Sequence, residues 1–276
     1  MTGFGDRLLA ALDQRLPLCV GIDPHPQLLE AWGLPQTPSG LRTFGEITVG
    51  AFGDQVAALK PQSAFFERFG AAGIGVLEDV VAGARAVGAL VVLDAKRGDI
   101  GSTAAAYADA YLDPERALFC DALTVSPYLG FGSLQPFIER AGEVGSGLFV
   151  LARTSNSEGA SVQAATGPEG LSTAQRIVDD AAAVNAALIA DGQSFGSIGV
   201  VVGATVAPGS VELGRLRGPV LAPGIGAQGA GGAELRAVFG DLPGVLPTSS
   251  REILGAGPDH DALRAAAERT AATLRG

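Results

Sequence analysis

The sequence predicts an α/β fold, a (β/α)8 TIM barrel that residues 1–276 form as a single domain. The first observation is a rhythm in which short β-branched or apolar runs alternate with alanine-rich stretches, as parallel βα units require. The second is the count of eight runs with no linker between them. An open doubly wound sheet is the alternative, because a count of strands does not show closure. The runs are residues 18–23, 56–60, 89–96, 121–126, 147–153, 197–203, 219–224 and 244–250.

Helices are expected between the runs, among them residues 102–112, 133–142 and 173–192. Gly192, at the end of the last of these, is a typical helix stop. The longest expected loop is residues 154–170, which is rich in serine, glycine and threonine and follows the fifth run. Loops that follow strands lie at the C-terminal end of such a barrel, where barrel enzymes have their active sites.

Hydrophobic residues make up 47% of the chain and charged residues 17%, which provides for one large core and excludes a disordered chain. No apolar run reaches the roughly 18 residues of a membrane span, and the N-terminal segment lacks the pattern of a signal peptide. Cys19 and Cys120 lie within apolar runs and have no metal-ligand spacing. We therefore expect a cytoplasmic protein with no membrane partner, in a reducing compartment.

The formal net charge is −10, from 19 basic and 29 acidic residues. Such a surface argues against a nucleic acid polymer as partner, because nucleic acids bind basic surfaces. A small anionic ligand is compatible with this charge if basic groups converge locally.

Acidic and basic side chains stand at the ends of three consecutive runs. Asp23 ends the first run and Lys60 the second, whereas Asp94 and Lys96 end the third. Because they are two residues apart on an extended strand, Asp94 and Lys96 are expected to project to the same face. Opposite charges about 4 Å apart attract by roughly 4 kcal/mol at an effective dielectric of about 20, but burial costs several kcal/mol per ion. We interpret the set as a candidate active site; solvated strand ends are the alternative.

Asp99 precedes Ile100 and Thr103 at the start of an alanine-rich helix. An aspartate in this position can cap the helix and complement its dipole. Local reasoning leaves a helix cap and a functional residue equally open.

A glycine-rich turn and an arginine follow the last two runs. Residues 221–232 read LAPGIGAQGAGG, a turn expected to expose backbone N–H groups, and Arg251 comes just after the eighth run. Loops after strands seven and eight are the usual phosphate site of a barrel, and a guanidinium suits a phosphate. The alternative is that these are ordinary loop glycines.

Other catalytic signatures are missing from the sequence. The only histidines are His25, in a loop between two prolines, and His260, which is expected to start the last helix. With so few histidines and no cysteine cluster, a zinc site is not expected. The chain has no G-x-S-x-G elbow, no P-loop and no dinucleotide fingerprint between a strand and a helix.

Several segments resemble the orotidine 5′-phosphate decarboxylase family. Residues 93–103, LDAKRGDIGST, fit that family's Asp-x-Lys-x-x-Asp-Ile signature and its following threonine. Residues 222–229, APGIGAQG, fit its phosphate-loop pattern Pro-Gly-(Val/Ile)-x-x-Gln-Gly, and Arg251 falls where its phosphate-binding arginine is expected. The length, the GIDPHP opening and the segment LKPQSAFFERFG resemble the longer bacterial subgroup.

The resemblance implies a catalytic role for four residues, Lys60, Asp94, Lys96 and Asp99, and a substrate-binding role for Asp23. Lys96 would donate a proton to C6 of the substrate, and Asp94 would lie near the substrate carboxylate. Asp23 and Lys60 would bind ribose hydroxyls and tie the charge network together. Asp99 would complete the catalytic set from a neighbouring subunit.

The resemblance also implies a homodimer and further substrate contacts. Ile100 and Thr103 would reach, with Asp99, into the partner's site. Ser155 would read the pyrimidine edge. The remaining substrate contacts would include two that hold the 5′-phosphate, Gln228 and Arg251, together with Pro223 and Ser250.

The activity implied is decarboxylation of orotidine 5′-monophosphate to UMP and CO2 in de novo pyrimidine biosynthesis, with no cofactor and no metal. Loss of CO2 from C6 leaves an sp² carbanion with no adjacent carbonyl sink. An ammonium held by two carboxylates is a preorganised stabiliser of that charge, and Lys96 can then protonate C6.

Three alternatives remain open. The nearest is a metal-dependent sugar-phosphate decarboxylase or aldolase of the same superfamily, which by resemblance would carry an acidic Mg²⁺ ligand where this chain has Lys60. A Schiff-base aldolase with Lys96 as nucleophile is the second, although flanking carboxylates should keep that amine protonated. A non-catalytic nucleotide-binding module is the third.

Overall fold

The computed structural model describes residues 2–226 and 229–275. Its centre is a closed barrel of eight parallel strands, each paired with its neighbours in sequence order. The strands are β1 (Leu16–Ile22), β2 (Val56–Pro61), β3 (Leu90–Arg97), β4 (Ala122–Val125), β5 (Gly147–Arg153), β6 (Ile198–Val202), β7 (Val220–Pro223) and β8 (Val245–Ser249). The ring closes where β1 pairs with β8, with Cys19 opposite Thr248. The predicted barrel is confirmed, and the alternative of an open sheet is wrong.

The strands read as apolar runs because both of their faces are covered. Every residue of β2, β4 and β6 is buried. Side chains of a barrel strand alternate between the interior and the surrounding helices, so both sets are apolar in parallel sheets. One core therefore fills the barrel and a second lies between the strands and the helices.

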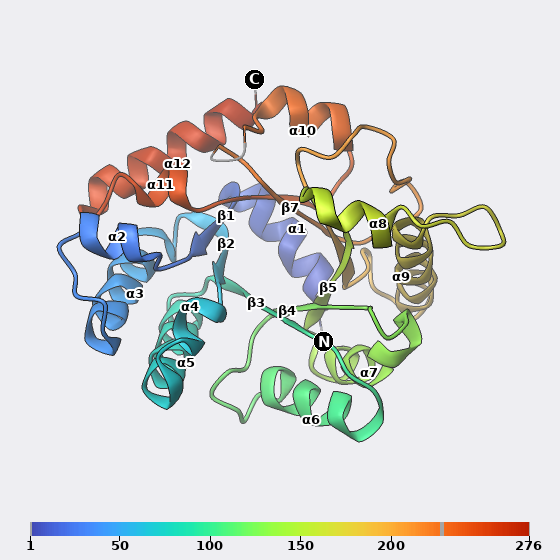
Figure 1. The fold of residues 1–276 in the computed structure, drawn as a ribbon, viewed down its shortest axis with the longest axis horizontal. Helices are drawn as coiled ribbons and strands as arrows, with labels where there is room; N and C mark the ends of the chain where they lie inside the picture. Colours follow the sequence, from blue (N-terminus) through green and yellow to red (C-terminus); the bar gives the residue numbers. More distant parts are fainter. Residues whose placement is uncertain (1, 227–228, 276) are drawn as a thin grey trace.

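Helices surround the barrel in a ring (Figure 1). The longer ones are α3 (Pro38–Phe52), α5 (Gly70–Ala86), α6 (Gly101–Leu112), α7 (Gln135–Val144), α9 (Thr173–Ala190), α10 (Gly232–Phe239) and α12 (His260–Arg275). Short helices lie in the connections: α2 (Pro26–Ala31), α4 (Ala64–Glu67), α8 (Ala160–Gln163), α11 (Arg251–Leu254) and the 3-10 turns η1 (Phe131–Leu134) and η2 (Ser157–Gly159).

The three helices expected at 102–112, 133–142 and 173–192 are present, with shifted ends. The second begins as the 3-10 turn η1 and becomes helical only at α7, whose first turn contains Pro136. The third ends at Ala190, and Gly192 follows with a φ of +106°, a conformation that suits glycine. The segment 154–170 is not a plain loop, because it contains η2 and α8.

The N-terminal helix α1 (Phe4–Gln14) packs against the barrel interior. Phe4 and Leu8 are fully buried, and the Phe4 ring meets the Phe149 ring edge-on with 5.8 Å between centroids. These side chains belong to the cluster that fills the barrel, which includes Cys19. In Figure 1, α1 lies within the ring of outer helices. No helix in the described ranges is long and apolar enough to cross a membrane.

Candidate active site

Four charged side chains meet at the C-terminal ends of the first three strands. Lys60 and Lys96 lie on β2 and β3, Asp94 lies on β3, and Asp23 directly follows β1. Parallel neighbours place these ends side by side, since Gly21 pairs with Lys60 and Gln62 bridges to Asp94. The chain has only two lysines, and both are here.

The charges alternate in sign along the group. The Lys60 Nζ lies 3.0 Å from Asp94 Oδ2 and 4.0 Å from Asp23 Oδ1. The Lys96 Nζ lies 2.5 Å from the other oxygen of Asp94, Oδ1. The structure therefore brings together the four residues predicted from the strand ends, and we call them the charged array.

Burial differs sharply within the charged array. Lys60 and Asp94 are buried, whereas the Lys96 side chain is 46% exposed. Burial alone would lower the pKa of Lys60, but the carboxylates of Asp94 and Asp23 outweigh it and hold that pKa above its usual range. Burial alone would raise the pKa of Asp94, but the two ammonium groups hold it below its usual range. Both buried members are thus charged at neutral pH, and Lys96 is the accessible ammonium.

Asp23 and Ser250 present polar atoms with no hydrogen-bond partner. Within the described residues, Asp23 Oδ1 and Ser250 Oγ are buried and make no hydrogen bond. Buried polar groups are normally satisfied, so two such atoms beside each other point to a ligand that pairs with them. Gly21 lies between them: a Cβ there would stand 2.9 Å from Ser250 Cβ and 3.0 Å from Asp23 Oδ2.

Gly21→Ala is expected to push Asp23 and Ser250 apart. We expect the KM for the substrate of this site to rise about tenfold or more, because a hydrogen bond to a charged group contributes about 1.5–3 kcal/mol. Gly75→Ala on α5 is the matched control, because a Cβ at Gly75 meets nothing within 4 Å. Steady-state kinetics of the two variants measure the difference; equal KM values would contradict this account of Gly21.

Arg251 begins α11, directly after β8, and its side chain is exposed. Its guanidinium makes no hydrogen bond or ion pair with the described residues. Its charge reaches His25: burial lowers the pKa of His25, Asp23 opposes this, and Arg251 lowers the pKa further. Arg251 and Asp23 therefore act on the same imidazole, at the same end of the barrel.

Three described amides of the glycine-rich turn are hydrogen-bonded rather than open, contrary to the prediction from the sequence. The amide of Gly226 donates to Ala230 O at 2.9 Å, and that of Gly229 donates to Gly226 O at 2.7 Å. The amide of Gly231 donates to the Glu234 carboxylate at 2.8 Å. These N–H groups are used within the turn, because the chain folds back tightly on itself there. Pro223 ends β7 beside the turn, and Gln228 lies outside the described residues.

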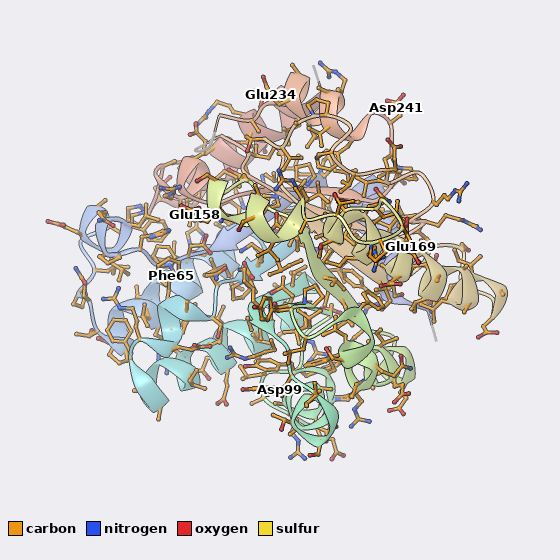
Figure 2. All side chains as sticks on the ribbon, turned by 45° about the vertical axis from the view of Figure 1, so that its right-hand side comes forward. Phe65, Asp99, Glu158, Glu169, Glu234 and Asp241 are labelled. Atoms are coloured by element: carbon orange, nitrogen blue, oxygen red, sulfur yellow. The ribbon has the colours of Figure 1, made fainter. Side chains whose placement is uncertain are left out.

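Among the described residues, no hydrogen bond or ion pair joins Asp99, Ile100 or Thr103 to the charged array. The Asp99 Oδ1 accepts the Ile100 amide at 2.8 Å, a local contact at the start of α6. Ile100 is 61% exposed, and Thr103 is exposed as well. Figure 2 shows Asp99 beside α6, away from Glu158 in the segment after β5. Within the described residues, the Asp99 side chain therefore makes its hydrogen bond at the start of α6.

Ser155 follows β5 and packs against the end of β6, where a Cβ on Gly203 would stand 3.3 Å from Ser155 Cβ. A residue that the sequence did not single out, Gln163, holds this segment. Its Oε1 accepts from the Thr154 amide at 2.9 Å and from Arg153 Nη1 at 3.1 Å. No local pattern could have indicated Gln163, because its partners lie nine and ten residues away and meet it only after α8 turns back.

His25 also lies near the candidate site, which its sequence position did not indicate. It stands at the N-cap of α2, and its ring meets the Phe65 ring with 4.2 Å between centroids. It thus belongs to the barrel mouth, although its sequence position between prolines indicated only a loop. His260 starts α12, as expected.

The described residues contain no group of three or more His, Cys, Asp or Glu side chains placed to hold a metal ion. The carboxylates of the charged array face lysine ammonium groups instead. Cys19 and Cys120 are both buried, and burial raises the pKa of Cys19 to about 12.

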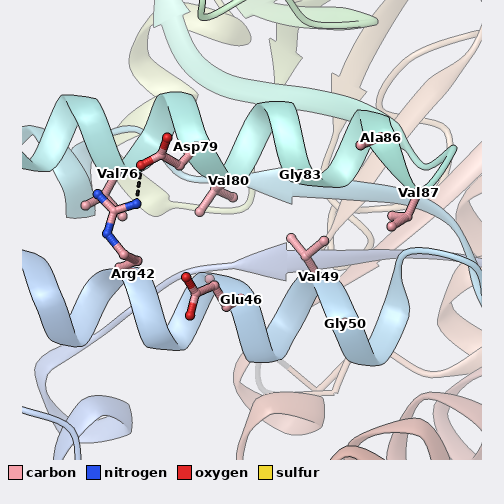
Figure 3. Close-up of a pocket in the computed structure, with 11 residues that line it drawn as sticks. Arg42, Glu46, Val49, Gly50, Val76, Asp79, Val80, Gly83, Ala86 and Val87 are labelled. Atoms are coloured by element: carbon pink, nitrogen blue, oxygen red, sulfur yellow. Dashed lines mark hydrogen bonds and ion pairs between the residues drawn. The ribbon is translucent and has the colours of Figure 1, made fainter.

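A groove of about 430 Å³ lies outside the barrel between α3 and α5 (Figure 3). Its walls include Val49, Val76 and Val80, and an ion pair between Arg42 and Asp79 stands at one end. None of the predicted site residues that the structure describes lines it. The groove and the charged array are therefore separate places.

Known proteins resemble this chain along its length. Residues 16–266 match the family described as orotidine 5′-phosphate decarboxylase / HUMPS. The chain is 56% identical over 276 residues to the orotidine 5′-phosphate decarboxylase of Salinispora tropica, with 100% of this chain and 98% of the relative covered. It is 56% identical over 277 residues to the protein of the same name from Streptomyces coelicolor, with the same coverage.

Solved structures agree with the sequence relatives. A crystal structure from Streptomyces avermitilis, provisionally named as the same decarboxylase, is 55% identical with a TM-score of 0.94 and covers 100% of this chain and 95% of its own. The Leishmania donovani OMP decarboxylase is 31% identical with a TM-score of 0.75, and each chain is covered to 100%. This chain belongs to the orotidine 5′-phosphate decarboxylase / HUMPS family.

Proposed function

We propose that this chain decarboxylates orotidine 5′-monophosphate to UMP and CO2 in de novo pyrimidine biosynthesis. Relatives that are 56% identical over the full length of this chain are named orotidine 5′-phosphate decarboxylase. The observation that carries the proposal is the alternating charged array, in which Asp94 binds Lys60 through one oxygen and Lys96 through the other.

The charged array suits a reaction that passes through an anion in the plane of the pyrimidine ring. Loss of CO2 leaves an electron pair on C6, and the ammonium of Lys96 stabilises that charge and then donates a proton to C6. Asp94 holds the ammonium in place and, with Lys60, preorganises the field before the substrate arrives. No reorganisation of these groups is needed at the moment of reaction, which is how fixed charges lower a barrier.

The substrate contacts follow from the polar atoms around the array. Asp23 accepts a hydrogen bond from a ribose hydroxyl, and the Ser250 hydroxyl binds an oxygen on the phosphate side, because both buried oxygens need partners. Arg251 binds the 5′-phosphate, supported by its exposed guanidinium without a protein partner among the described residues. Pro223 and Gln228 complete the phosphate side, and Ser155 reads the pyrimidine edge.

A homodimer would give Asp99, Ile100 and Thr103 a role. The exposed Ile100 and Thr103, next to a carboxylate with only a local contact, support an interface there. We place Asp99 in the partner's site as a member of its charged array. We further infer that residues 1–276 form one catalytic domain and that the enzyme works in the cytoplasm.

The reaction needs neither a metal nor another cofactor in this proposal. A hard cation would have to share the space between Asp23 and Asp94 with the ammonium of Lys60, which is already 3.0 Å from one carboxylate. This disfavours a metal-dependent sugar-phosphate decarboxylase or aldolase. Turnover is therefore expected to be the same before and after treatment with a chelator such as EDTA; a loss that added Mg²⁺ restores would favour the metal-dependent alternative.

The test of the proposed function is a turnover assay on purified, chelator-treated protein. Decarboxylation changes the ultraviolet spectrum of orotidine 5′-monophosphate, so the absorbance reports product directly. Conversion to UMP is the expected result. An unchanged spectrum with tight UMP binding would identify a nucleotide-binding module instead, and a borohydride-trapped adduct with a keto substrate would indicate a Schiff-base aldolase.

A further inference from the structure

The part of β3 that carries Asp94 and Lys96 departs from the regular ladder. Leu93 pairs with Leu123 on β4, and the next pair is Arg97 with Val125. Residues 94–96 therefore stand opposite a single residue of β4. Such bulges disrupt ladder hydrogen bonds and re-aim side chains, and they are common next to active sites.

Lys96 has an unusual backbone within this bulge. Its φ is +48°, in the left-handed region that residues with a Cβ rarely adopt. The prediction that Asp94 and Lys96 face the same way on an extended strand is right in its result, but the strand is not extended at Lys96. Backbones of this kind persist only where the surroundings hold them.

Thr124 is the residue opposite the bulge, and its hydroxyl holds both ends of it. The Thr124 Oγ1 accepts the Lys96 amide N–H at 3.0 Å and donates to Asp94 Oδ1 at 2.8 Å. A threonine hydroxyl has one hydrogen, so these two roles are fixed by its partners. The same Asp94 oxygen lies 2.5 Å from the Lys96 Nζ. Thr124 is 1% exposed, so water does not replace the bonds of its hydroxyl.

We propose that Thr124 is a positioning residue for the reaction, acting through Lys96 and Asp94. The inference rests on the proposed function, because it assigns the orientation of the proton donor to one buried hydroxyl. The hydroxyl takes the place of the ladder partner that the bulge removes, and so keeps the Lys96 backbone in its left-handed form. The Lys96 ammonium is then held next to the Asp94 oxygen, at the C-terminal end of the barrel.

Thr124→Val and Thr124→Ser test the proposal, since valine keeps the shape and serine keeps the hydroxyl. We expect Thr124→Val to lower kcat about 10- to 100-fold, since a small misplacement of a reacting group has effects of that size. KM and the Kd for UMP should stay near the parent values, and Thr124→Ser should regain most of the lost kcat. The matched control is Thr48→Val on α3, a buried threonine whose hydroxyl bonds only to Phe44 O.

A second readout does not depend on activity. With two lysines in the chain, protein labelled with [¹⁵N]lysine gives two backbone amide signals, and Lys96→Arg assigns them. In Thr124→Val the Lys96 amide should shift and exchange faster with solvent, while the Lys60 amide stays in place. Thr48→Val should move neither signal.

The outcomes separate the two proposals. A parent protein that does not convert orotidine 5′-monophosphate would refute the proposed function. A parent that turns over, with Thr124→Val at parental kcat or Thr124→Ser as slow as Thr124→Val, would overturn the role of Thr124. Equal losses of kcat and UMP affinity would also overturn it, since they would show a general structural defect. Should Thr124→Val not fold, Thr124→Ser against Thr124→Ala decides on the same criteria.

Discussion

Replacing Lys96 with alanine is expected to lower kcat for orotidine 5′-monophosphate by roughly 10⁴-fold or more, because one change removes both the proton donor and the cation that faces the developing charge. The Kd for UMP should change little, since the phosphate and ribose contacts lie elsewhere. Lys96 is half exposed, so the fold does not depend on it as it does on Lys60. Absorbance assays at saturating substrate and UMP titrations measure the two quantities.

Two further variants make this first result specific. Lys96→Arg keeps a positive charge but a guanidinium does not release its proton in proteins, so it should remain far slower than the parent. Arg215→Ala removes an exposed cation outside the site and should leave kcat unchanged. Parental turnover in Lys96→Ala would refute the assignment of the proton donor.

Asp94→Asn is expected to have the second largest effect. It abolishes the carboxylate that joins the two lysines, so kcat should fall by several orders of magnitude. The free energy of unfolding should fall as well. Removing one partner of a buried ion pair costs about 3–5 kcal/mol of unfolding free energy. The exposed pair of Arg42 and Asp79 provides the control, because Asp79→Asn should cost no more than about 1 kcal/mol.

The stability defect of Asp94→Asn should depend on pH in a defined direction. The pKa of Asp94 is held below its usual range in the folded protein, whereas the unfolded carboxyl titrates near its ordinary value of about 3.9. The carboxylate therefore stabilises the fold fully above about pH 4, and its contribution is lost as the pH falls further. Denaturant titrations of parent and variant should show a constant gap from pH 7 to pH 5 that narrows below pH 4. A gap that widens in acid would contradict the array.

The contribution of Lys60 to stability depends on pH in the opposite direction, because the pKa of Lys60 is raised in the folded protein. Its stabilising contribution is present below the unfolded value of about 10.4 and is lost only as the pH rises above it. Lys60 therefore stays charged at neutral and acidic pH. The loss of stability as the pH falls comes from protonation of the carboxylates.

The barrel could be predicted because its rhythm is local: apolar runs of strand length alternate with helical stretches, and both faces of each strand are covered. The charged array could also be predicted, since parallel strands place Asp23, Lys60 and Asp94 at one end whatever the details of packing. Membership in the family, which the motif around Lys96 indicated, is confirmed by the family match and the relatives.

The supporting contacts could not be predicted from the sequence. Thr124 matters only because β3 bulges opposite it, and a register shift of this kind leaves no mark in an apolar run. Gln163 clasps Thr154 through a reversal of the chain that no periodicity encodes. Within the described part of the glycine turn, the amides of Gly226 and Gly229 bond to the turn's own carbonyls, although glycine content alone indicated open donors.

The central claim is that an ammonium at position 96, held by Asp94, protonates the substrate. Lys96→Cys followed by alkylation with bromoethylamine tests it most directly, because the reaction rebuilds an ammonium on a side chain of nearly the same length. The native thiols should not compete, since Cys19 and Cys120 are buried and burial raises the pKa of each.

We expect Lys96→Cys to be as inactive as Lys96→Ala and to regain a large part of its kcat once mass spectrometry shows one aminoethyl group per chain. UMP affinity should stay the same throughout. Complete alkylation of a folded, UMP-binding variant with no recovery of turnover would contradict the claim.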